Sequence, residues 1–175
     1  SMVYELGRDQ AWQERCRRQC LELGPSPTLA EIEAATDLDL VMKEALRLHP
    51  PVPVLARKAV KETEILGVRI PAGRLVAVMP LLSHHMPEYW TDPEVFDPER
   101  FSPDRREDKS HRFAWEPFGG GVHKCLGMIF ARLESTLVLS ALLRHFEWSV
   151  PADYVPPMRN ESLLAVMPTG GGKSL

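Results

Sequence analysis

The sequence lacks any long hydrophobic run. Its longest apolar stretch, Leu137 to Leu143, contains Ser140 and falls far below the roughly 20 residues that span a bilayer. The first residues, Ser1 to Arg8, lack the basic start and the apolar core of a signal peptide. We therefore expect no membrane span and no export, which leaves the cytoplasm as the default location.

An excess of positive charge is also missing. The chain has 21 Lys and Arg residues against 24 Asp and Glu residues, and the resulting net charge of −3 favours no nucleic-acid partner. Its 175 residues predict about one domain, and a hydrophobic content of 44% is enough for a sizeable core. These values exclude a disordered tail and a coiled coil.

Cysteine is scarce, with three residues at spacings that suit no disulfide framework. Cys16 and Cys20 lie four apart in an expected helix, and no His or Cys partner is near enough to complete a zinc site. We predict that both are packing residues. Cys125 differs because it lies in glycine-rich sequence beside His123 and Lys124, where a thiolate is electrostatically favoured. The remaining histidines show no ligand spacing and are expected to be structural: His49, His84, His85, His111 and His145.

Proline, by contrast, is abundant, and most of the 16 prolines fall between Pro50 and Pro117 or from Pro151 onward. Prolines at this density predict long irregular segments. The expected organisation is mainly α with small β-hairpin sheets (α+β). It comprises helices over 3–49, a small sheet over 54–78, an ordered loop over 86–117, a glycine-rich loop over 118–127, a long helix over 128–145 and terminal strands within 146–170. The terminal strands are expected at Phe146 to Val150 and Ser162 to Met167.

Helix boundaries and buried faces follow from local patterns. Thr28 and Glu31 form a predicted capping box, and Thr36 is expected to cap the next helix. One face of that next helix should be core: Leu38, Val41, Met42, Ala45 and Leu48. The long helix over 128–145 should be largely buried along one stripe: Ile129, Leu133, Leu137, Ala141 and Leu142.

The chemistry centres on the segment from Phe118 to Gly127, which reads FGGGVHKCLG and places Cys125 between a flexible loop and a helix start. The helix dipole and the unpaired amides of the first turn stabilise negative charge on the sulfur. Glycines allow a flat cofactor to approach the backbone closely. Haem is the cofactor that fits, although a lone cysteine near a helix start is more often a buried packing residue.

The same segment resembles the haem-ligand signature of the cytochrome P-450 family, F-x-x-G-x-x-x-C-x-G, with Phe118, Gly121, Cys125 and Gly127 in register. The resemblance implies that Cys125 ligates the iron of haem b. It also implies a set of residues that bind this cofactor: Arg57, Phe118, Gly119, Gly121, His123, Cys125 and Gly127.

Two further family motifs occur upstream in the expected order. They are E-x-x-R at Glu44 and Arg47, and P-E-R-F, which contains Arg100. On spacing alone, Glu44 and Arg47 suit an ordinary surface ion pair on one helix face. The resemblance implies instead a buried network with Arg100 that holds the loop leading to the cysteine.

Arg57 and His123 lie at family positions that usually bind the haem propionates, for which cationic donors are suited. Many family members carry arginine where this chain has His123, so the charge at that position depends on protonation. Without the resemblance, Arg57 would be read as a solvated strand residue. The resemblance also places several residues in a pocket for a lipophilic substrate: Val52, Val54, Leu55, Ser162 and Leu163.

The resemblance extends from about Tyr4 to about Met167 but covers only the C-terminal part of the family's sequence, so we expect residues 1–175 to be a single partial domain. It implies NAD(P)H-dependent monooxygenation through ferredoxin and ferredoxin reductase, with Lys124 and Arg132 as candidates for the donor-facing surface. The bacterial sterol-demethylase-like group is the nearest subgroup. The chain alone is expected to be inactive.

Two alternatives come from other functional classes. The chain could be a non-catalytic haem-binding fragment, or an interaction fragment that folds only with the N-terminal half. The segment from Met167 to Leu175 also resembles the phosphate-binding loop of RecQ-family helicases through Lys173. Since no helix follows the lysine to supply a dipole, we expect no nucleotide binding there.

Overall fold

The structure, a computed structural model, describes residues 1–23, 26–154 and 156. Its helices are α1 (Met2–Arg8), α2 (Gln10–Glu22), α3 (Leu29–Glu33), α4 (Thr36–Leu48), α5 (Pro80–His84) and α6 (Met128–His145). Its strands are β1 (Leu55–Lys58), β2 (Thr63–Ile65), β3 (Val68–Ile70) and β4 (Leu75–Val78). Short 3-10 helices follow at η1 (Pro98–Phe101), η2 (Glu107–Lys109) and η3 (Gly121–His123). The expected fold class, mainly α with small antiparallel sheets, is confirmed.

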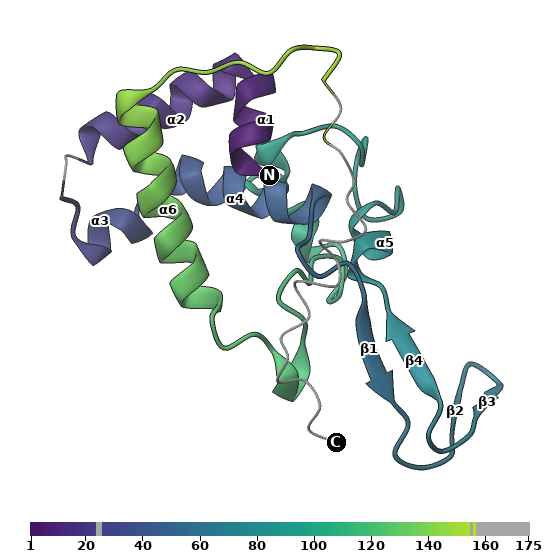
Figure 1. Cartoon of the computed structure of the whole chain (residues 1–175). Coiled ribbons are helices and arrows are strands. Elements are labelled where there is room, and N and C mark those ends of the chain that lie inside the picture. Colours follow the sequence, from purple (N-terminus) through teal and green to yellow (C-terminus); the bar gives the residue numbers. More distant parts are fainter. Residues whose placement is uncertain (24–25, 155, 157–175) are drawn as a thin grey trace.

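The main hydrophobic core lies where α1, α2, α4 and α6 meet, and the strands extend away from it (Figure 1). Cys16 and Cys20 are fully buried in this core. Burial raises the pKa of both thiols, so they stay neutral and act as packing residues. Leu38 and Val41 of α4 contribute to the same core, as the helical spacing of α4 predicts.

The capping prediction for the α3 helix is confirmed. The Thr28 hydroxyl accepts a hydrogen bond from the Glu31 amide, and the Glu31 carboxylate accepts one from the Thr28 amide at 2.7 Å. The cap expected at Thr36 is wrong, because Ala35 occupies the N-cap and makes no side-chain cap. Asp37 and Asp39 in the first turn place negative charge at this helix end instead.

The predicted small sheet consists of two separate antiparallel pairs. Strand β1 pairs with β4, with Leu55 opposite Val78, while β2 and β3 form a hairpin inserted between them in the sequence. The hairpin turns at Leu66 and Gly67, both with positive φ, at 50° and 79°. The strands reach the end of the molecule opposite α2 (Figure 1).

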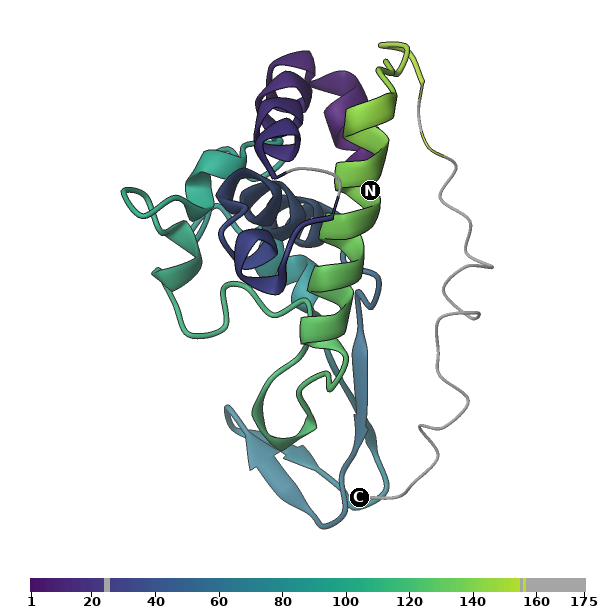
Figure 2. The same cartoon turned by 90° about the vertical axis from the view of Figure 1, so that its left-hand side faces the viewer.

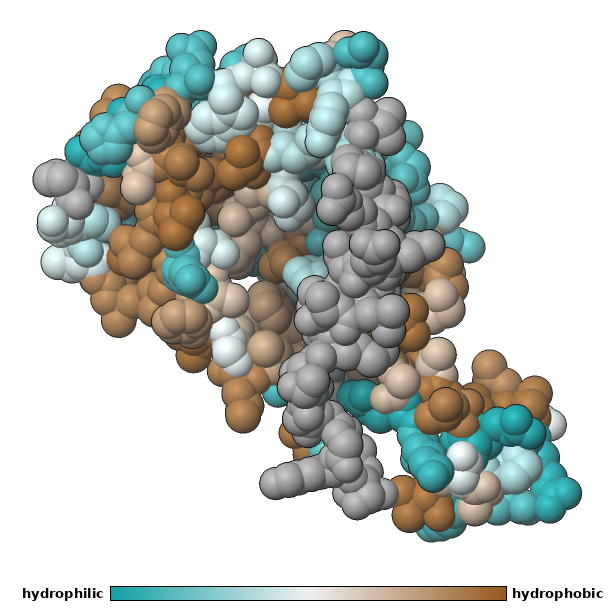
Figure 3. All heavy atoms as spheres, in the orientation of Figure 1, coloured by the Kyte–Doolittle hydropathy of each residue, from teal (hydrophilic) through white to brown (hydrophobic). Residues whose placement is uncertain are grey.

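The expectation that α6 is largely buried is wrong. Its buried residues are Thr136, Leu139, Ser140 and Leu143. Three members of the predicted stripe, Ile129, Leu137 and Ala141, are exposed instead. Because apolar residues surround the whole helix, the sequence does not mark the side that α2 and α4 cover. The uncovered side forms an apolar band in Figure 3.

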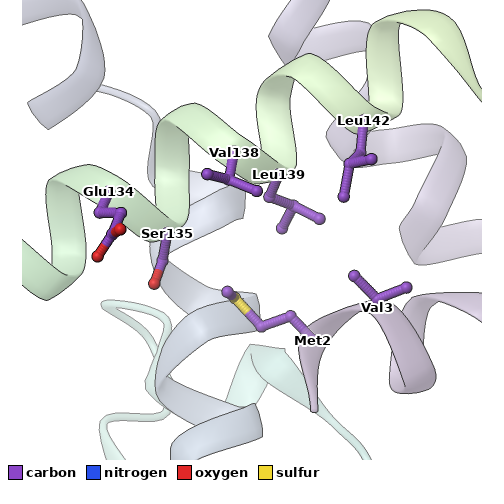
Figure 4. Close-up of a pocket in the computed structure, with 7 residues that line it drawn as sticks. All are labelled: Met2, Val3, Glu134, Ser135, Val138, Leu139 and Leu142. Carbon is purple, nitrogen blue, oxygen red and sulfur yellow. The ribbon is translucent and has the colours of Figure 1, made fainter.

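A shallow groove runs between α1 and α6. Figure 4 shows Met2 and Val3 of α1 facing Val138, Leu139 and Leu142 of α6. Val138 is 54% exposed, so the apolar surface of this groove is accessible to solvent. Figure 2 shows α6 from the side. An exposed apolar band of this kind favours association.

The strand predicted at Phe146 to Val150 is also wrong. The segment forms its hydrogen bonds with the first two helices rather than with another strand. The Val150 amide donates to the Gly7 carbonyl at 2.9 Å, and the Trp148 indole donates to the Val3 carbonyl at 2.7 Å. The strand predicted at Ser162 to Met167 lies outside the described residues.

Within the described ranges, no helix is both long enough and apolar enough to cross a membrane.

We expect the uncovered band of α6 to make the chain self-associate, because association removes apolar surface from water. The variant Val138→Lys should elute closer to the monomer than the wild type at equal concentration, measured by size exclusion with light scattering. The variant Glu134→Gln, on the same exposed side, is the control and should elute like the wild type. A monomeric wild type at high concentration would contradict this prediction.

Candidate functional site

Glu44 of α4 is the centre of a buried ion network. Its carboxylate accepts hydrogen bonds from Arg47 Nε at 2.7 Å and Arg47 Nη2 at 2.9 Å. It also accepts one from Arg100 Nε in η1 at 3.0 Å. All three residues are fully buried. The structure thus brings Arg100 together with Glu44 and Arg47, the two residues for which spacing alone suited a surface pair.

The remaining donors of the network are also satisfied. Arg100 Nη1 donates to the Thr91 carbonyl at 2.6 Å and to Glu107 at 3.0 Å. Burial acts to raise the pKa of Glu107, but hydrogen bonds from Arg105 and the Thr91 amide outweigh it, so this pKa lies below its usual range. Two arginines therefore face two carboxylates. Within the described residues, no buried side-chain nitrogen or oxygen lacks a partner.

His84, the last residue of α5, connects this network to the next loop. Arg47 Nη1 donates to the His84 carbonyl at 2.6 Å, and the His84 Nδ1 atom lies 3.2 Å from the Arg47 carbonyl. His84 Nε2 accepts from the Glu116 amide at 2.9 Å. These partners assign a neutral ring with its proton on Nδ1. Burial, reinforced by the charges of Arg47 and His85, lowers the pKa of His84 to about 4.

The glycine-rich loop presents Cys125 at the surface. The Cys125 amide donates to the Phe118 carbonyl at 2.9 Å, which closes the loop before α6 begins at Met128. Gly119 and Gly121 both have φ of 67°, a left-handed conformation that side-chain-bearing residues rarely adopt. Cys125 is exposed, unlike Cys16 and Cys20.

Aromatic packing fixes the start of this loop. Phe101 packs edge-on against Trp115 at 5.8 Å between ring centroids, and Trp115 packs edge-on against Phe118 at 6.2 Å. The Trp115 indole donates to the Lys43 carbonyl of α4 at 3.2 Å. The P-E-R-F segment, α4 and the loop are therefore joined by direct contacts.

The other predicted site residues make fewer contacts with the loop that carries Cys125. Leu55 of β1 lies beside the loop, because a Cβ on Gly119 would be 3.6 Å from Leu55 Cδ1. Arg57 Nη1 bonds only the carbonyl of its neighbour Ala56, at 2.9 Å, and His123 is exposed. Within the described part of the chain these two side chains share no hydrogen bond. Of the predicted pocket residues, Val52 is exposed, Val54 and Leu55 are half-buried, and Ser162 and Leu163 lie outside the described residues.

Exposed apolar side chains lie near Cys125 in the sequence, together with the exposed polar residues His123 and Lys124. Val122, three residues before the cysteine, and Leu126, directly after it, are 93% and 102% exposed, and Ile129 and Phe130 in the first turn of α6 are also exposed. No three His, Cys, Asp or Glu side chains among residues 1–23, 26–154 and 156 come together as a metal site. Cys125 therefore offers a single exposed sulfur donor, with exposed apolar side chains close to it in the sequence.

A thiol on a glycine loop that is tied to a buried Glu–Arg–Arg network is the arrangement that the family resemblance implies. The sequence model described as Cytochrome P450 matches residues 1–174. The chain belongs to the cytochrome P450 family.

Three relatives show the breadth of this similarity. The protein named "Putative cytochrome P450 136" from Mycobacterium tuberculosis is 46% identical over 159 residues, which cover 89% of this chain and 32% of the relative. Sterol 14alpha-demethylase from the same organism is 41% identical, covering 73% of this chain and 28% of the relative. Human cytochrome P450 4F2 is 37% identical, covering 93% and 32%. The chain thus spans about a third of the length of these relatives.

The sequence did not predict the contact between His84 and the Glu116 amide. The residues around His84 show no periodicity or ligand spacing. His84 is expected to be structural, but that expectation names no residue as its hydrogen-bond partner. The contact depends on the folded path of residues 85–116, which brings Glu116 back to α5. No local sequence signal reports it.

We predict that Glu44→Ala lowers the free energy of unfolding by about 3–5 kcal/mol, because it leaves two buried arginines without their shared carboxylate. Asp39→Ala is the control on the same helix, where the carboxylate forms solvent-accessible pairs with Lys43 and Arg132. That change should cost only about 1 kcal/mol. Urea denaturation measures both, and equal losses would contradict a special role for Glu44.

The lowered pKa of His84 predicts a pH dependence. Between about pH 6.5 and pH 4 the unfolded state protonates this histidine while the folded state does not, so stability falls as pH falls. One such proton contributes up to about 1.4 kcal/mol per pH unit. His84→Gln should flatten the dependence of unfolding free energy on pH in this window. His145→Gln, at an exposed histidine, should leave it unchanged, and equal slopes in all three proteins would refute the assignment.

Proposed function

We propose that this chain is the haem-ligating part of a haem-thiolate monooxygenase, with Cys125 as the axial ligand of haem b. The observation that carries this proposal is the geometry of Cys125, an exposed thiol on a closed glycine loop that also exposes the apolar side chains of Val122 and Leu126. Cys16 and Cys20 are poor candidates, because their thiols are buried and their pKa values are raised.

The residues present fit this cofactor. Haem iron of this class would take one thiolate from the protein, and the loop offers a single exposed sulfur donor, Cys125. Exposed Val122 and Leu126 fit the apolar face of a porphyrin, and Gly119 and Gly121 keep the loop backbone free of side chains. When bound, haem would supply oxygen activation, and thiolate ligation favours cleavage of the O–O bond.

Other residues would orient the cofactor and the substrate. Arg57 of β1 and His123 of the loop are proposed to bind the haem propionates as hydrogen-bond donors. A lipophilic substrate is proposed to contact the residues that the family resemblance assigns to the pocket: Val52, Val54, Leu55, Ser162 and Leu163. The sterol that the name of one relative indicates belongs to this chemical class.

Electrons would come from NAD(P)H through ferredoxin and ferredoxin reductase in the cytoplasm. Lys124 is the exposed cation next to Cys125 and is proposed to face an acidic donor. Arg132 supports this surface less strongly, because its Nε atom already pairs with Asp39 at 2.9 Å. We further propose that the chain alone does not turn over substrate.

A second candidate function is favoured by the uncovered side of α6. Exposed Ile129, Phe130 and Val138 suit a fragment that docks on complementary helices, such as the N-terminal half of the same protein. Haem binding by the isolated chain separates the two candidates, because an interaction fragment would bind haem only after its partner is added.

We predict that Cys125→Ala abolishes the thiolate signature, the red-shifted Soret band of the reduced carbon monoxide complex. The change removes the only exposed sulfur among the three cysteines. The spectrum is recorded on haem-reconstituted wild type and variant, and Cys16→Ala serves as the control that keeps the signature. A variant at Cys125 that retains the band would eliminate it as the ligand.

A further inference from the structure

His84 occupies a position between the buried arginines and the loop that carries Cys125. Its ring is fully buried, and its backbone and Nδ1 atom exchange two hydrogen bonds with Arg47, at 2.6 and 3.2 Å. Its other ring nitrogen, Nε2, accepts from the Glu116 amide at 2.9 Å. One imidazole thereby links α4, α5 and the start of the glycine-rich loop.

The amide that His84 binds lies close in the chain to the loop closure. Glu116 precedes Phe118 by two residues, and the Phe118 carbonyl accepts the amide of Cys125 at 2.9 Å. The Glu116 carbonyl in turn accepts the amide of Gly119 at 3.1 Å. A shift of Glu116 would therefore displace both ends of the turn that presents the thiol.

We propose that His84 is a positioning residue for Cys125, which it holds in place by accepting the Glu116 amide through a neutral imidazole anchored on Arg47. The proposal rests on the proposed function only in naming Cys125 as the iron ligand. The hydrogen bonds of His84 go to Arg47 and Glu116, so it acts on Cys125 only through the loop.

Hydrogen-bond acceptance, rather than volume, is the property that the position requires. Aromatic contacts of Trp115 already hold the loop start against Phe101, so a merely space-filling role would be met by any side chain of similar size. The Glu116 amide is partly buried and needs an acceptor, because an amide that is shielded from water and has no partner loses free energy of solvation. Burial also lowers the pKa of His84, which keeps Nε2 free to accept at neutral pH.

The variants separate these two roles. His84→Gln keeps an acceptor oxygen near the place of Nε2, whereas His84→Leu fills the space without one. His85→Leu is the matched control, since the His85 ring bonds Glu94 at 2.7 Å and makes no hydrogen bond to the loop. The haem-free readouts are hydrogen exchange of the Glu116 amide and the rate at which Cys125 reacts with a thiol reagent.

We expect His84→Leu to speed exchange of the Glu116 amide by about tenfold or more and to change the Cys125 reaction rate, while His84→Gln stays within about twofold of the wild type. His85→Leu should change neither. The proposal is overturned if His84→Leu leaves Glu116 exchange unchanged, or if the glutamine variant loosens the loop as much as the leucine variant.

Nitrogen chemical shifts of the wild-type ring keep the test decisive where the leucine variant fails to fold. The expected result is a neutral ring with its proton on Nδ1, and a proton on Nε2 would overturn the proposal. In haem-reconstituted protein, His84→Leu should also lower the fraction of the carbon monoxide complex that shows the thiolate band. Failure of Cys125→Ala to abolish that band would refute the proposed function, whereas the exchange result tests the role of His84 independently.

Discussion

The carboxylate of Glu44 is the group on which the rest of this structure depends. It is fully buried and is shared by Arg47 three residues later and by Arg100 at a distance of 56 residues. Two buried guanidinium groups would be intolerable without it, and Glu107 supplies the second negative charge. Because Arg47 and Arg100 also donate to carbonyls of residues 84, 91, 92 and 95, the network fixes the path of an otherwise irregular segment.

This network acts on the cysteine through intermediates. Two routes lead from it to the loop, one through the imidazole of His84 to the Glu116 amide, and one through the ring contacts of Phe101, Trp115 and Phe118. The hydrogen bond of His84 is polar and directional, whereas the ring contacts are apolar and persist when the rings move slightly. The polar route therefore sets the register of the loop, while the aromatic route supplies the buried area that keeps it closed.

The parts of the fold that could be predicted are those that local patterns determine. The buried face of α4 has a clear contrast between apolar and polar sides, and the Thr28 capping box spans only four residues. On α6 the contrast is missing, so periodicity could not identify the covered side. The segment from Phe146 to Val150 has strand-like composition, but composition names no partner, and Gly7 accepts its hydrogen bond. The Glu44 network could be proposed only through family resemblance, since its spacing equally suits a surface pair.

The buried network around Glu44 and the exposed loop around Cys125 differ in whether their side chains already have partners within the chain. Every buried polar side-chain atom in the described residues has a partner within the chain, so the network around Glu44 requires no cofactor to satisfy it. The loop around Cys125 is the opposite, with Val122 and Leu126 almost wholly exposed. A loop closed by the Cys125 amide and tied to a satisfied network is preorganised, which reduces the entropy lost when a ligand binds. The buried charged groups of the chain thus neutralise one another. The exposed apolar side chains of Val122 and Leu126, near the thiol in the sequence, remain available to the proposed cofactor.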